Sequence, residues 1–271
     1  MAADGYATAD RRVFGDVAET YHRFRPGYPA AVYELLRDRC GLRPGIAAFE
    51  VGPGTGQATR ELLAMDVDPL LAIEPDERLA AHITTDAGED GRAEALRLQV
   101  SRFEDAMLPR ASFDLGLAAT SFHWLDQGPA LTRVADALQP GGWWAMWWNM
   151  FGEQVGHDPF HEATKHLLDG PDSGPNLSAA ERPFPLDADA RRHDLLATGG
   201  FTDIGFELIR RVVPFDAEAT VGLYRTFSPV ANRPEAERER VLAGLARIVD
   251  EQFGGRVDRT VLTPVHTARR I

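Results

Sequence analysis

The chain has 271 residues, of which 44% are hydrophobic, and its formal net charge is −12. This length suits one large α/β domain or two small ones, and the apolar content excludes a mainly disordered chain. The acidic balance argues against general binding to nucleic-acid phosphates. No window approaches the roughly 18 apolar residues of a membrane span, and residues 1–10 do not resemble a signal peptide.

Cys40 is the single cysteine, so an intramolecular disulfide and a cysteine-rich zinc site are both excluded. We expect a buried, inert thiol near the end of a helix. His157 and His161 have the spacing of one helical face, but no further ligand accompanies them, so no metal site is expected. These features favour a reducing, cytoplasmic environment.

Apolar runs alternate with helical patterns through the first half of the chain. The predicted strands are 46–51, 70–73, 96–100, 113–119 and 143–148, and the predicted helices are 30–40, 58–65, one that begins after an N-cap at Asp76, and 129–138. Five strands that alternate with helices indicate the α/β class, with a parallel, doubly wound sheet.

The pattern changes after Asn149, and residues 150–190 contain several Pro and Gly. Because the later helices lie between two strands, we expect them to fold over the edge of the sheet as a lid. The predicted helices of this half are 161–168, 187–198, 217–227 and 234–253, and the predicted strands are 204–213 and 257–268.

A glycine-rich turn, Gly52-Pro53-Gly54-Thr55-Gly56, joins the first predicted strand to a predicted helix. Glycines at such a junction let the backbone bend sharply and let a ligand approach without a Cβ in the way. Glu74 lies about twenty residues further on, at the end of the next strand, where a carboxylate can bind both ribose hydroxyls of an adenosine. A purely structural turn and a helix-capping acid are the alternatives for these residues.

Three adenosine cofactors compete for this turn. A phosphate-binding loop needs a lysine followed by Ser or Thr, and here Gln57 and Ala58 follow the glycines. A dinucleotide site favours a third glycine at the position of Gln57. The acid before the turn, Glu50, suits a cofactor that carries an ammonium group and no phosphate. S-adenosylmethionine, with its cationic sulfonium, fits best.

The chain resembles the class I S-adenosylmethionine-dependent methyltransferases over about residues 10–150. The motifs that match, in order, are Glu-x-Gly-x-Gly-x-Gly at 50–56, Glu74, Phe113-Asp114-Leu115 and Leu138-Gln139-Pro140-Gly141-Gly142. The stretches 14–29 and 121–124 are similar to a small-molecule branch that includes the trans-aconitate methyltransferases.

This resemblance implies a Rossmann-like, seven-stranded sheet with the last strand antiparallel. It also implies three parts of the chain. Residues 1–45 would form an N-terminal helical cap, and 46–150 the core that binds S-adenosylmethionine. Residues 151–271 would complete the sheet and supply a helical lid and an acceptor pocket.

The resemblance further implies which residues border the cofactor. They are Tyr21, Glu50, Gly52, Gly54, Gly56, Gln57, Glu74, Pro75, Phe103, Glu104 and Thr120. At one position the chain departs from the pattern, since Arg102 stands where many relatives have Asp.

Methyl transfer from a sulfonium is an in-line displacement that needs alignment and exclusion of water, and a base only when the acceptor arrives protonated. His123 is the candidate base, because it follows the fourth strand and titrates near neutrality; alternatively, it packs the pocket wall. Arg25 could bind a carboxylate of the acceptor or pair with an acid of the sheet, and both alternatives remain open. The candidate acceptor-binding residues are Arg25, Tyr28, Trp124, Trp148, Asn149 and Phe151.

The sequence therefore predicts a cytoplasmic methyltransferase of small molecules, with the oxygen of a carboxylate or hydroxyl slightly preferred as acceptor. No nucleic-acid or membrane partner is expected, and the protein could be a monomer or a homodimer. Two alternatives stay open. One is a protein that binds S-adenosylmethionine for another reaction or for sensing, and the other is a NAD-dependent oxidoreductase.

Overall fold

The computed structural model describes residues 18–151, 158–168 and 183–271. The chain forms two compact units, each built from segments that are distant in the sequence. The first, here called the sheet unit, comprises Gly27–Asn149, Arg182–Ile209 and Thr263–Ile271. The second, the helical unit, comprises Met1–Pro26, Met150–Glu181 and Arg210–Leu262.

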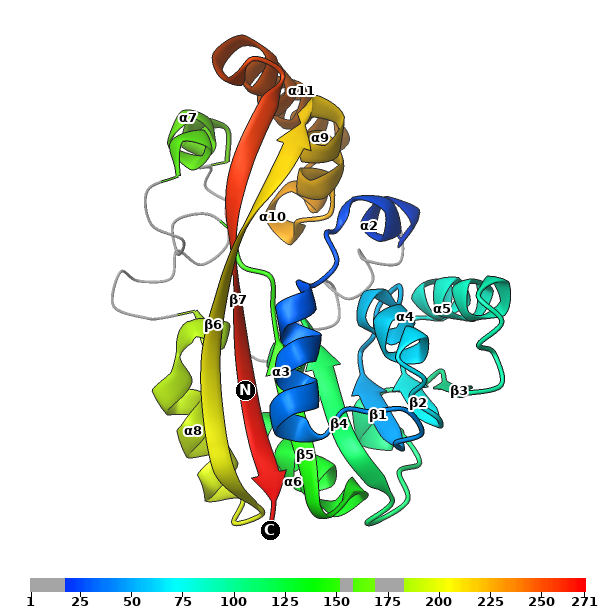
Figure 1. Ribbon diagram of the computed structural model, residues 1–271. Coiled ribbons are helices and arrows are strands. Elements are labelled where there is room, and N and C mark those ends of the chain that lie inside the picture. Colours follow the sequence, from blue (N-terminus) through cyan, green and yellow to red (C-terminus); the bar gives the residue numbers. More distant parts are fainter. Residues whose placement is uncertain (1–17, 152–157, 169–182) are drawn as a thin grey trace. The chain divides into compact units, whose positions relative to one another are not determined.

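A seven-stranded sheet in the order β3-β2-β1-β4-β5-β7-β6 dominates the fold (Figure 1). Its strands are β1 (Ala48–Val51), β2 (Leu70–Ile73), β3 (Leu96–Gln99), β4 (Phe113–Ala119), β5 (Leu138–Trp147), β6 (Phe201–Asp216) and β7 (Arg256–Arg270). Strands β1 to β5 pair in parallel, and β7 pairs antiparallel with β5. The predicted Rossmann-like sheet with its last strand antiparallel is confirmed.

Helices follow most strands, close to their predicted positions. They are α2 (Ala18–Phe24), α3 (Ala30–Cys40), α4 (Gln57–Ala64), α5 (Glu77–Glu89), α6 (Gln127–Ala137), α7 (Pro159–Leu168), α8 (Ala188–Ala197), α9 (Ala217–Arg225), α10 (Ser228–Ala231) and α11 (Glu235–Phe253). Short 3-10 turns are η1 (Phe103–Asp105), η2 (Phe122–Trp124) and η4 (Phe184–Leu186). Asp76 caps α5 as predicted, because its side chain accepts a hydrogen bond from the Arg78 N–H.

Several predicted boundaries differ from the structure by one to three residues, and the start of one strand differs by more. Strand β5 begins at Leu138, which pairs with Phe113, and not at Trp143. The glycines before Trp143 therefore lie within the strand instead of preceding it, next to a shift in its register with β4. A Cβ on Gly142 would lie 2.9 Å from the carbonyl oxygen of Gln139, so the close approach of neighbouring backbone requires glycine there.

Alternate side chains of the central strands pack on opposite faces of the sheet, which is typical of a parallel sheet covered on both sides. Leu117 and Trp147 belong to the core beneath α3 and α4. On the other face, Trp144 stacks on Phe49 at 6.2 Å and lies 4.8 Å from Phe122. Figure 1 shows α3 in front of the sheet, with α6 and α8 behind it.

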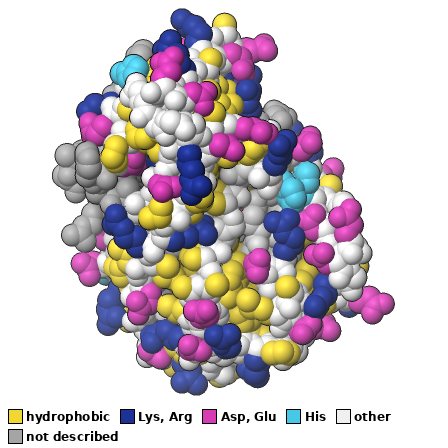
Figure 2. Space-filling model, turned by 45° about the horizontal axis from the view of Figure 1, so that its top comes forward, with side chains coloured by type: hydrophobic (Ala, Val, Ile, Leu, Met, Phe, Trp, Pro, Cys, Tyr) yellow, Lys and Arg dark blue, Asp and Glu magenta, His cyan; other side chains and the backbone are white. Residues whose placement is uncertain are grey.

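The surface mixes charges of both signs. Figure 2 shows Lys and Arg side chains interspersed with Asp and Glu side chains over the visible face. Among the helices of residues 18–151, 158–168 and 183–271, none combines the length and apolar composition needed to cross a membrane.

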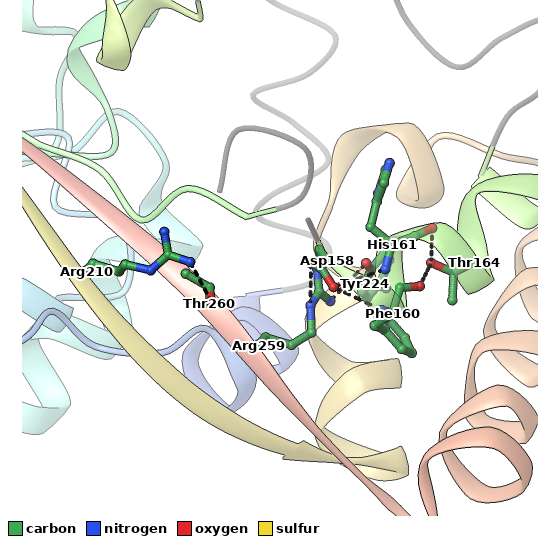
Figure 3. A network of polar contacts seen from close by, with 8 residues as sticks. All are labelled: Asp158, Phe160, His161, Thr164, Arg210, Tyr224, Arg259 and Thr260. Atoms are coloured by element: carbon green, nitrogen blue, oxygen red, sulfur yellow. Dashed lines mark hydrogen bonds and ion pairs between the residues drawn. The ribbon is translucent and has the colours of Figure 1, made fainter. Parts of the chain in front are cut away.

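The helical unit has its own hydrophobic core, to which α7, α9 and α11 contribute. A buried ion pair lies within it: the Arg259 Nε donates to Asp158 Oδ2 at 3.0 Å, and Nη1 lies 3.2 Å from the Tyr224 hydroxyl (Figure 3). Asp158 also accepts hydrogen bonds from the backbone N–H groups of Phe160 and His161, at the start of α7. These contacts join β7, α7 and α9 of this unit.

The segments predicted to form a lid are divided between the two units. Residues 217–227 and 234–253 belong to the helical unit, whereas 183–190 belong to the sheet unit. Residues 152–157 and 169–182 lie outside the described residues. The lid therefore stays a prediction.

Candidate active site

The glycine-rich turn leads from β1 into α4 with a backbone that only glycine adopts readily. Gly52, Gly54 and Gly56 have φ values of 62°, 63° and 86°, all in the left-handed region. A Cβ on Gly52 would also lie 2.6 Å from the Cβ of Ser121, which follows β4. The turn and the segment after β4 therefore approach each other closely at the carboxyl end of the parallel strands, where open α/β sheets bind ligands.

Glu74 holds the turn from the neighbouring strand. Its side chain is buried at the end of β2. One carboxylate oxygen accepts a hydrogen bond from the Gly54 N–H at 2.9 Å, and the other accepts from the Asp76 N–H at 3.0 Å. Each oxygen of an ionised carboxylate can accept more than one hydrogen bond, so the chemistry of this side chain suits donors such as the hydroxyls of a ribose.

Glu50 lies at the base of the turn with an incomplete set of partners. Its side chain is fully buried, and the Thr59 hydroxyl donates to Oε2 at 2.7 Å. Within the described residues, Oε1 has no hydrogen-bond partner. Burial raises the pKa of Glu50 to about 7, and the nearby charge of Glu74 adds to this shift. A buried carboxylate in this state favours the approach of a cation or a proton donor.

This turn fits a cationic cofactor better than a phosphate. Residues 50–57 contain an acid and no basic side chain, and a second acid, Glu74, contacts the turn. At the end of the turn, Gln57 is buried and its Oε1 accepts a hydrogen bond from the Thr55 hydroxyl at 3.1 Å. A pyrophosphate would meet two carboxylates here, whereas an ammonium or sulfonium would be attracted to them.

Three of the residues predicted to border the cofactor lie after β2 and β3. Phe103 is buried, and the Arg133 guanidinium lies 5.6 Å from its ring centre. Glu104 forms an exposed ion pair with Arg102 at 3.1 Å, and Pro75 is exposed. Arg102, the residue that departs from the family pattern, is therefore partly neutralised by its neighbour.

Thr120 and Tyr28 meet at the carboxyl end of β4. Thr120 has a φ of 64°, and its backbone N–H donates to the carbonyl of Trp147 at 2.8 Å. Its hydroxyl lies 2.9 Å from that of Tyr28, whose ring packs edge-on against Trp147 at 5.6 Å. A predicted cofactor residue is thus in contact with a predicted acceptor residue.

An aromatic cluster surrounds His123 on η2. The Ser121 hydroxyl donates to the carbonyl of Val51, which ties the start of η2 to the glycine-rich turn. The Trp148 Nε1–H donates to His123 Nδ1 at 3.0 Å. The rings of Trp124 and Phe184 lie 4.8 and 6.3 Å from the imidazole.

The hydrogen bond from Trp148 determines the tautomer of the His123 ring. An indole nitrogen can only donate, so Nδ1 must be unprotonated to accept from it. Burial among the surrounding protein atoms also lowers the pKa of His123 to about 4, although the side chain itself keeps an exposed surface. Both observations describe a neutral imidazole that carries its proton on Nε2.

His266 and Phe184 are members of this cluster that the sequence did not indicate. The Trp148 ring lies 6.1 Å from His266 and 5.5 Å from Phe184. His266 is buried, its Nε2 lies 2.8 Å from the Pro185 carbonyl, and burial lowers its pKa to about 4. Because these residues are far apart in the sequence, no local pattern could have found them.

Asn149 is the remaining predicted acceptor-binding residue of the sheet unit. The Thr263 hydroxyl donates to its Oδ1 at 3.0 Å, and its Nδ2 donates to the Gly27 carbonyl at 3.3 Å.

Arg25, Tyr21 and Phe151 lie in the helical unit. The Arg25 Nε donates to the Thr226 hydroxyl at 2.8 Å and its Nη2 to the Thr226 carbonyl at 3.2 Å, while the guanidinium lies 5.0 Å from the Tyr21 ring centre. Phe151 packs edge-on against Phe227 at 6.0 Å. Neither of these partners is an acid of the sheet or a ligand, so both predicted roles of Arg25 stay predictions.

The described residues contain no group of three His, Cys, Asp or Glu side chains placed to hold a metal ion. Of the two histidines with helical spacing, His161 lies on α7 and His157 lies outside the described residues.

With this geometry in view, comparison with known proteins identifies the domain. Residues 49–146 match the family model described as a methyltransferase domain. The chain therefore contains a methyltransferase domain. A relative from Schizosaccharomyces pombe, described as the uncharacterized methyltransferase C25B8.09, is 25% identical over 94% of this chain and 96% of its own length. The uncharacterized methyltransferase Rv3342 of Mycobacterium tuberculosis is 29% identical, over 53% of this chain and about half (54%) of its own length.

Solved structures show the same fold for this methyltransferase. A putative type II methyltransferase from Anaeromyxobacter dehalogenans superposes with a TM-score of 0.59 at 21% identity, over 91% of this chain and 98% of that one. The YcgJ protein of Bacillus subtilis gives a TM-score of 0.55 at 16% identity, over 89% of this chain and 98% of that one. The likeness extends well beyond residues 49–146.

Proposed function

We propose that this methyltransferase transfers the methyl group of S-adenosylmethionine to an oxygen of a small molecule, either a carboxylate or a hydroxyl. The observation that carries the proposal is the glycine-rich turn between two buried carboxylates, Glu50 and Glu74. S-adenosylmethionine supplies an activated methyl group on a sulfonium, together with an ammonium and a ribose. The first two are cations, and the ribose offers two hydroxyl donors, so all three match this pair of acids.

Each part of the turn has a role in this proposal. The glycines allow the cofactor to approach the backbone, Glu74 accepts from the ribose hydroxyls, and Oε1 of Glu50 attracts the ammonium group. Further residues would border the cofactor. In the sheet unit these are Gln57, Pro75, Phe103, Glu104 and Thr120.

A small acceptor fits the charge of the protein better than a nucleic acid does. The formal net charge is −12, and the charges on the face in Figure 2 are mixed in sign. The trans-aconitate-like branch remains the proposed subgroup, with helices of the chain acting as a lid. Within the sheet unit, the acceptor would be bound by Tyr28, Trp124, Trp148 and Asn149.

A reducing compartment such as the cytoplasm is proposed from the state of the cysteine. Cys40 is 3% exposed, and burial raises the pKa of its thiol to about 12, so it is unreactive.

Thermal unfolding with candidate ligands tests the cofactor. A ligand that binds the folded state at 100 times its Kd stabilises it by about 2.7 kcal/mol. We expect S-adenosylmethionine and S-adenosylhomocysteine to raise the Tm and NAD to leave it unchanged. Stabilisation by NAD alone would instead support an oxidoreductase.

Product analysis tests the reaction. The protein is incubated with S-adenosylmethionine carrying a ¹³C-methyl group and a panel of small carboxylic acids, alcohols and phenols. Mass spectrometry should detect a labelled methyl ester or ether. Tight binding of S-adenosylmethionine without a methylated product from a wide panel would favour the sensing alternative.

A further inference from the structure

The hydrogen bond between Trp148 and His123 limits which polar atom the imidazole can offer to a methyl acceptor. Trp148 follows β5 directly and is fully buried, so its indole is held in place by the core of the sheet unit. Its N–H donor occupies Nδ1, the one lone pair that a neutral imidazole with a proton on Nε2 possesses. The only polar atom that the ring can offer to a ligand is then the Nε2–H.

We propose that Trp148 holds His123 as a hydrogen-bond donor through Nε2–H, and that this donor selects a carboxylate as the methyl acceptor. This inference rests on the proposed function, and it replaces the general base expected from the sequence. His123 would be the residue that touches the acceptor, and Trp148 a positioning residue that acts through it.

The surroundings of the ring oppose its conversion to a base. The rings of Trp124 and Phe184 pack 4.8 and 6.3 Å from the imidazole and replace part of its water, which disfavours a charge on it. A proton added to Nδ1 would also face the indole N–H of Trp148, so two donors would meet. Both effects favour the neutral ring.

A carboxylate is the acceptor whose chemistry this donor matches. One of its oxygens accepts the hydrogen bond from Nε2–H. The other uses a lone pair to form the bond to the methyl carbon while the carbon–sulfur bond breaks and its electron pair stays on sulfur. The products are a methyl ester and a neutral thioether, and no proton has to leave. An alcohol, phenol or thiol would carry a proton that this ring has no lone pair to accept.

The position of η2 supports contact with the reacting groups. Ser121, two residues before His123, donates to the carbonyl of Val51 and limits the side chain at Gly52. His123 therefore begins beside the turn proposed to bind the cofactor, within the same unit of the structure.

The tautomer is measured directly by NMR of the protein labelled with ¹⁵N-histidine, with His123 assigned by its loss in H123Q. We expect a protonated Nε2, an unprotonated Nδ1 and no titration between pH 5.5 and 8. In W148F the donor is absent, and we expect mixed tautomers and a higher pKa for His123. The matched control is W144F, because Trp144 is also buried but its Nε1 has no hydrogen-bond partner in the described part of the chain. W144F should keep the wild-type tautomer.

Kinetics separate a donor from a base. The side chain of Gln carries an N–H donor but is not a base, so H123Q should retain more activity than H123A, by about tenfold or more in kcat/KM. The affinity for S-adenosylhomocysteine should stay the same in both. Equal losses in the two variants would overturn the proposal, and so would a protonated Nδ1 or a His123 that titrates near 6.5 in the wild-type protein.

Acceptors are compared in matched pairs: phenylacetate with 2-phenylethanol, and octanoate with octanol. Methyl esters without methyl ethers support the proposal, whereas ethers without esters overturn it. If neither forms, the proposed function fails on these probes, and the tautomer of His123 still decides this inference on its own.

Discussion

The Glu74 carboxylate accepts a hydrogen bond from Gly54 in the glycine-rich turn, the Glu50 carboxylate before the turn accepts one from Thr59 on α4, and the charge of Glu74 contributes to the raised pKa of Glu50. Like charges in a buried place destabilise each other until a cation or a proton arrives. The two acids therefore favour the binding of a positively charged ligand at this turn.

This relationship predicts how E50Q changes stability. The folded-state pKa of Glu50 is about 7, above its unfolded value of 4.5, so the cost of ionising it develops as the pH rises from 4.5 to 7. Above pH 7, E50Q should raise the free energy of unfolding by up to about 3 kcal/mol, and below pH 4.5 by little. Urea unfolding at pH 5 and pH 8 measures the difference. The control E61Q removes an exposed acid from α4 and should change neither value. A pH-independent effect of E50Q would contradict the assignment.

Gly52 should be more sensitive to substitution than a glycine with similar dihedral angles elsewhere. G52A adds a Cβ at a φ of 62° and 2.6 Å from Ser121, whereas G91A adds one at 69° with no atom within 4 Å. In both variants the left-handed backbone lowers the free energy of unfolding by about 1 kcal/mol, but only in G52A does the new Cβ also displace a neighbouring side chain. Thermal unfolding should show the larger loss for G52A, together with weaker binding of S-adenosylhomocysteine. Equal losses would show that the contact is unimportant.

Glu74 should contribute to affinity as well as to the shape of the turn. In E74Q the amide keeps one acceptor oxygen but turns an NH₂ group toward a backbone donor, so one hydrogen bond is lost. We expect S-adenosylhomocysteine to bind about 10- to 100-fold more weakly, which corresponds to about 1–3 kcal/mol. Isothermal titration calorimetry measures this loss, and E77Q, an exposed acid on α5, serves as the control. Unchanged affinity in E74Q would remove Glu74 from the site.

The ion pair between Arg259 and Asp158 predicts a different kind of sensitivity, in the helical unit. The two side chains are 2% and 5% exposed, so R259M leaves a buried carboxylate without its cation. We expect a loss of about 3–5 kcal/mol in the free energy of unfolding. The matched surface pair, Arg110 and Asp136, is 79% and 44% exposed, and R110M should cost less than about 1 kcal/mol. Similar losses in the two variants would contradict the buried pair.

Much of the parallel sheet could be predicted from the sequence because its strands are short apolar runs between glycines and charged residues. Residues 70–73 and 113–119 are examples where predicted and observed strands coincide. Strand β5 was harder, because Pro140 and the glycines after it indicate a turn, while the strand pairs with β4 on both sides of them, at Leu138 and again from Trp143. Tertiary pairing outweighed local preference there.

The candidate site could be predicted only in part. Glu50, Glu74 and the glycines follow from their place at strand ends, which a sequence shows. That Oε1 of Glu50 lacks a partner, or that Nδ1 of His123 is occupied, depends on packing between segments far apart in the chain. His123 and Trp148 are 25 residues apart, so only the folded structure shows that they meet.

Calorimetric titration with S-adenosylmethionine at pH 6 and pH 8 tests the central claim most directly. Binding of the cation should favour the ionised form of Glu50, whose pKa is about 7, so the affinity should be weaker at pH 6 than at pH 8. We predict up to about a tenfold difference in Kd for the wild-type protein, and a clearly smaller one for E50Q. The same pH dependence in both proteins, or no binding of S-adenosylmethionine to the folded wild-type chain, would contradict the account.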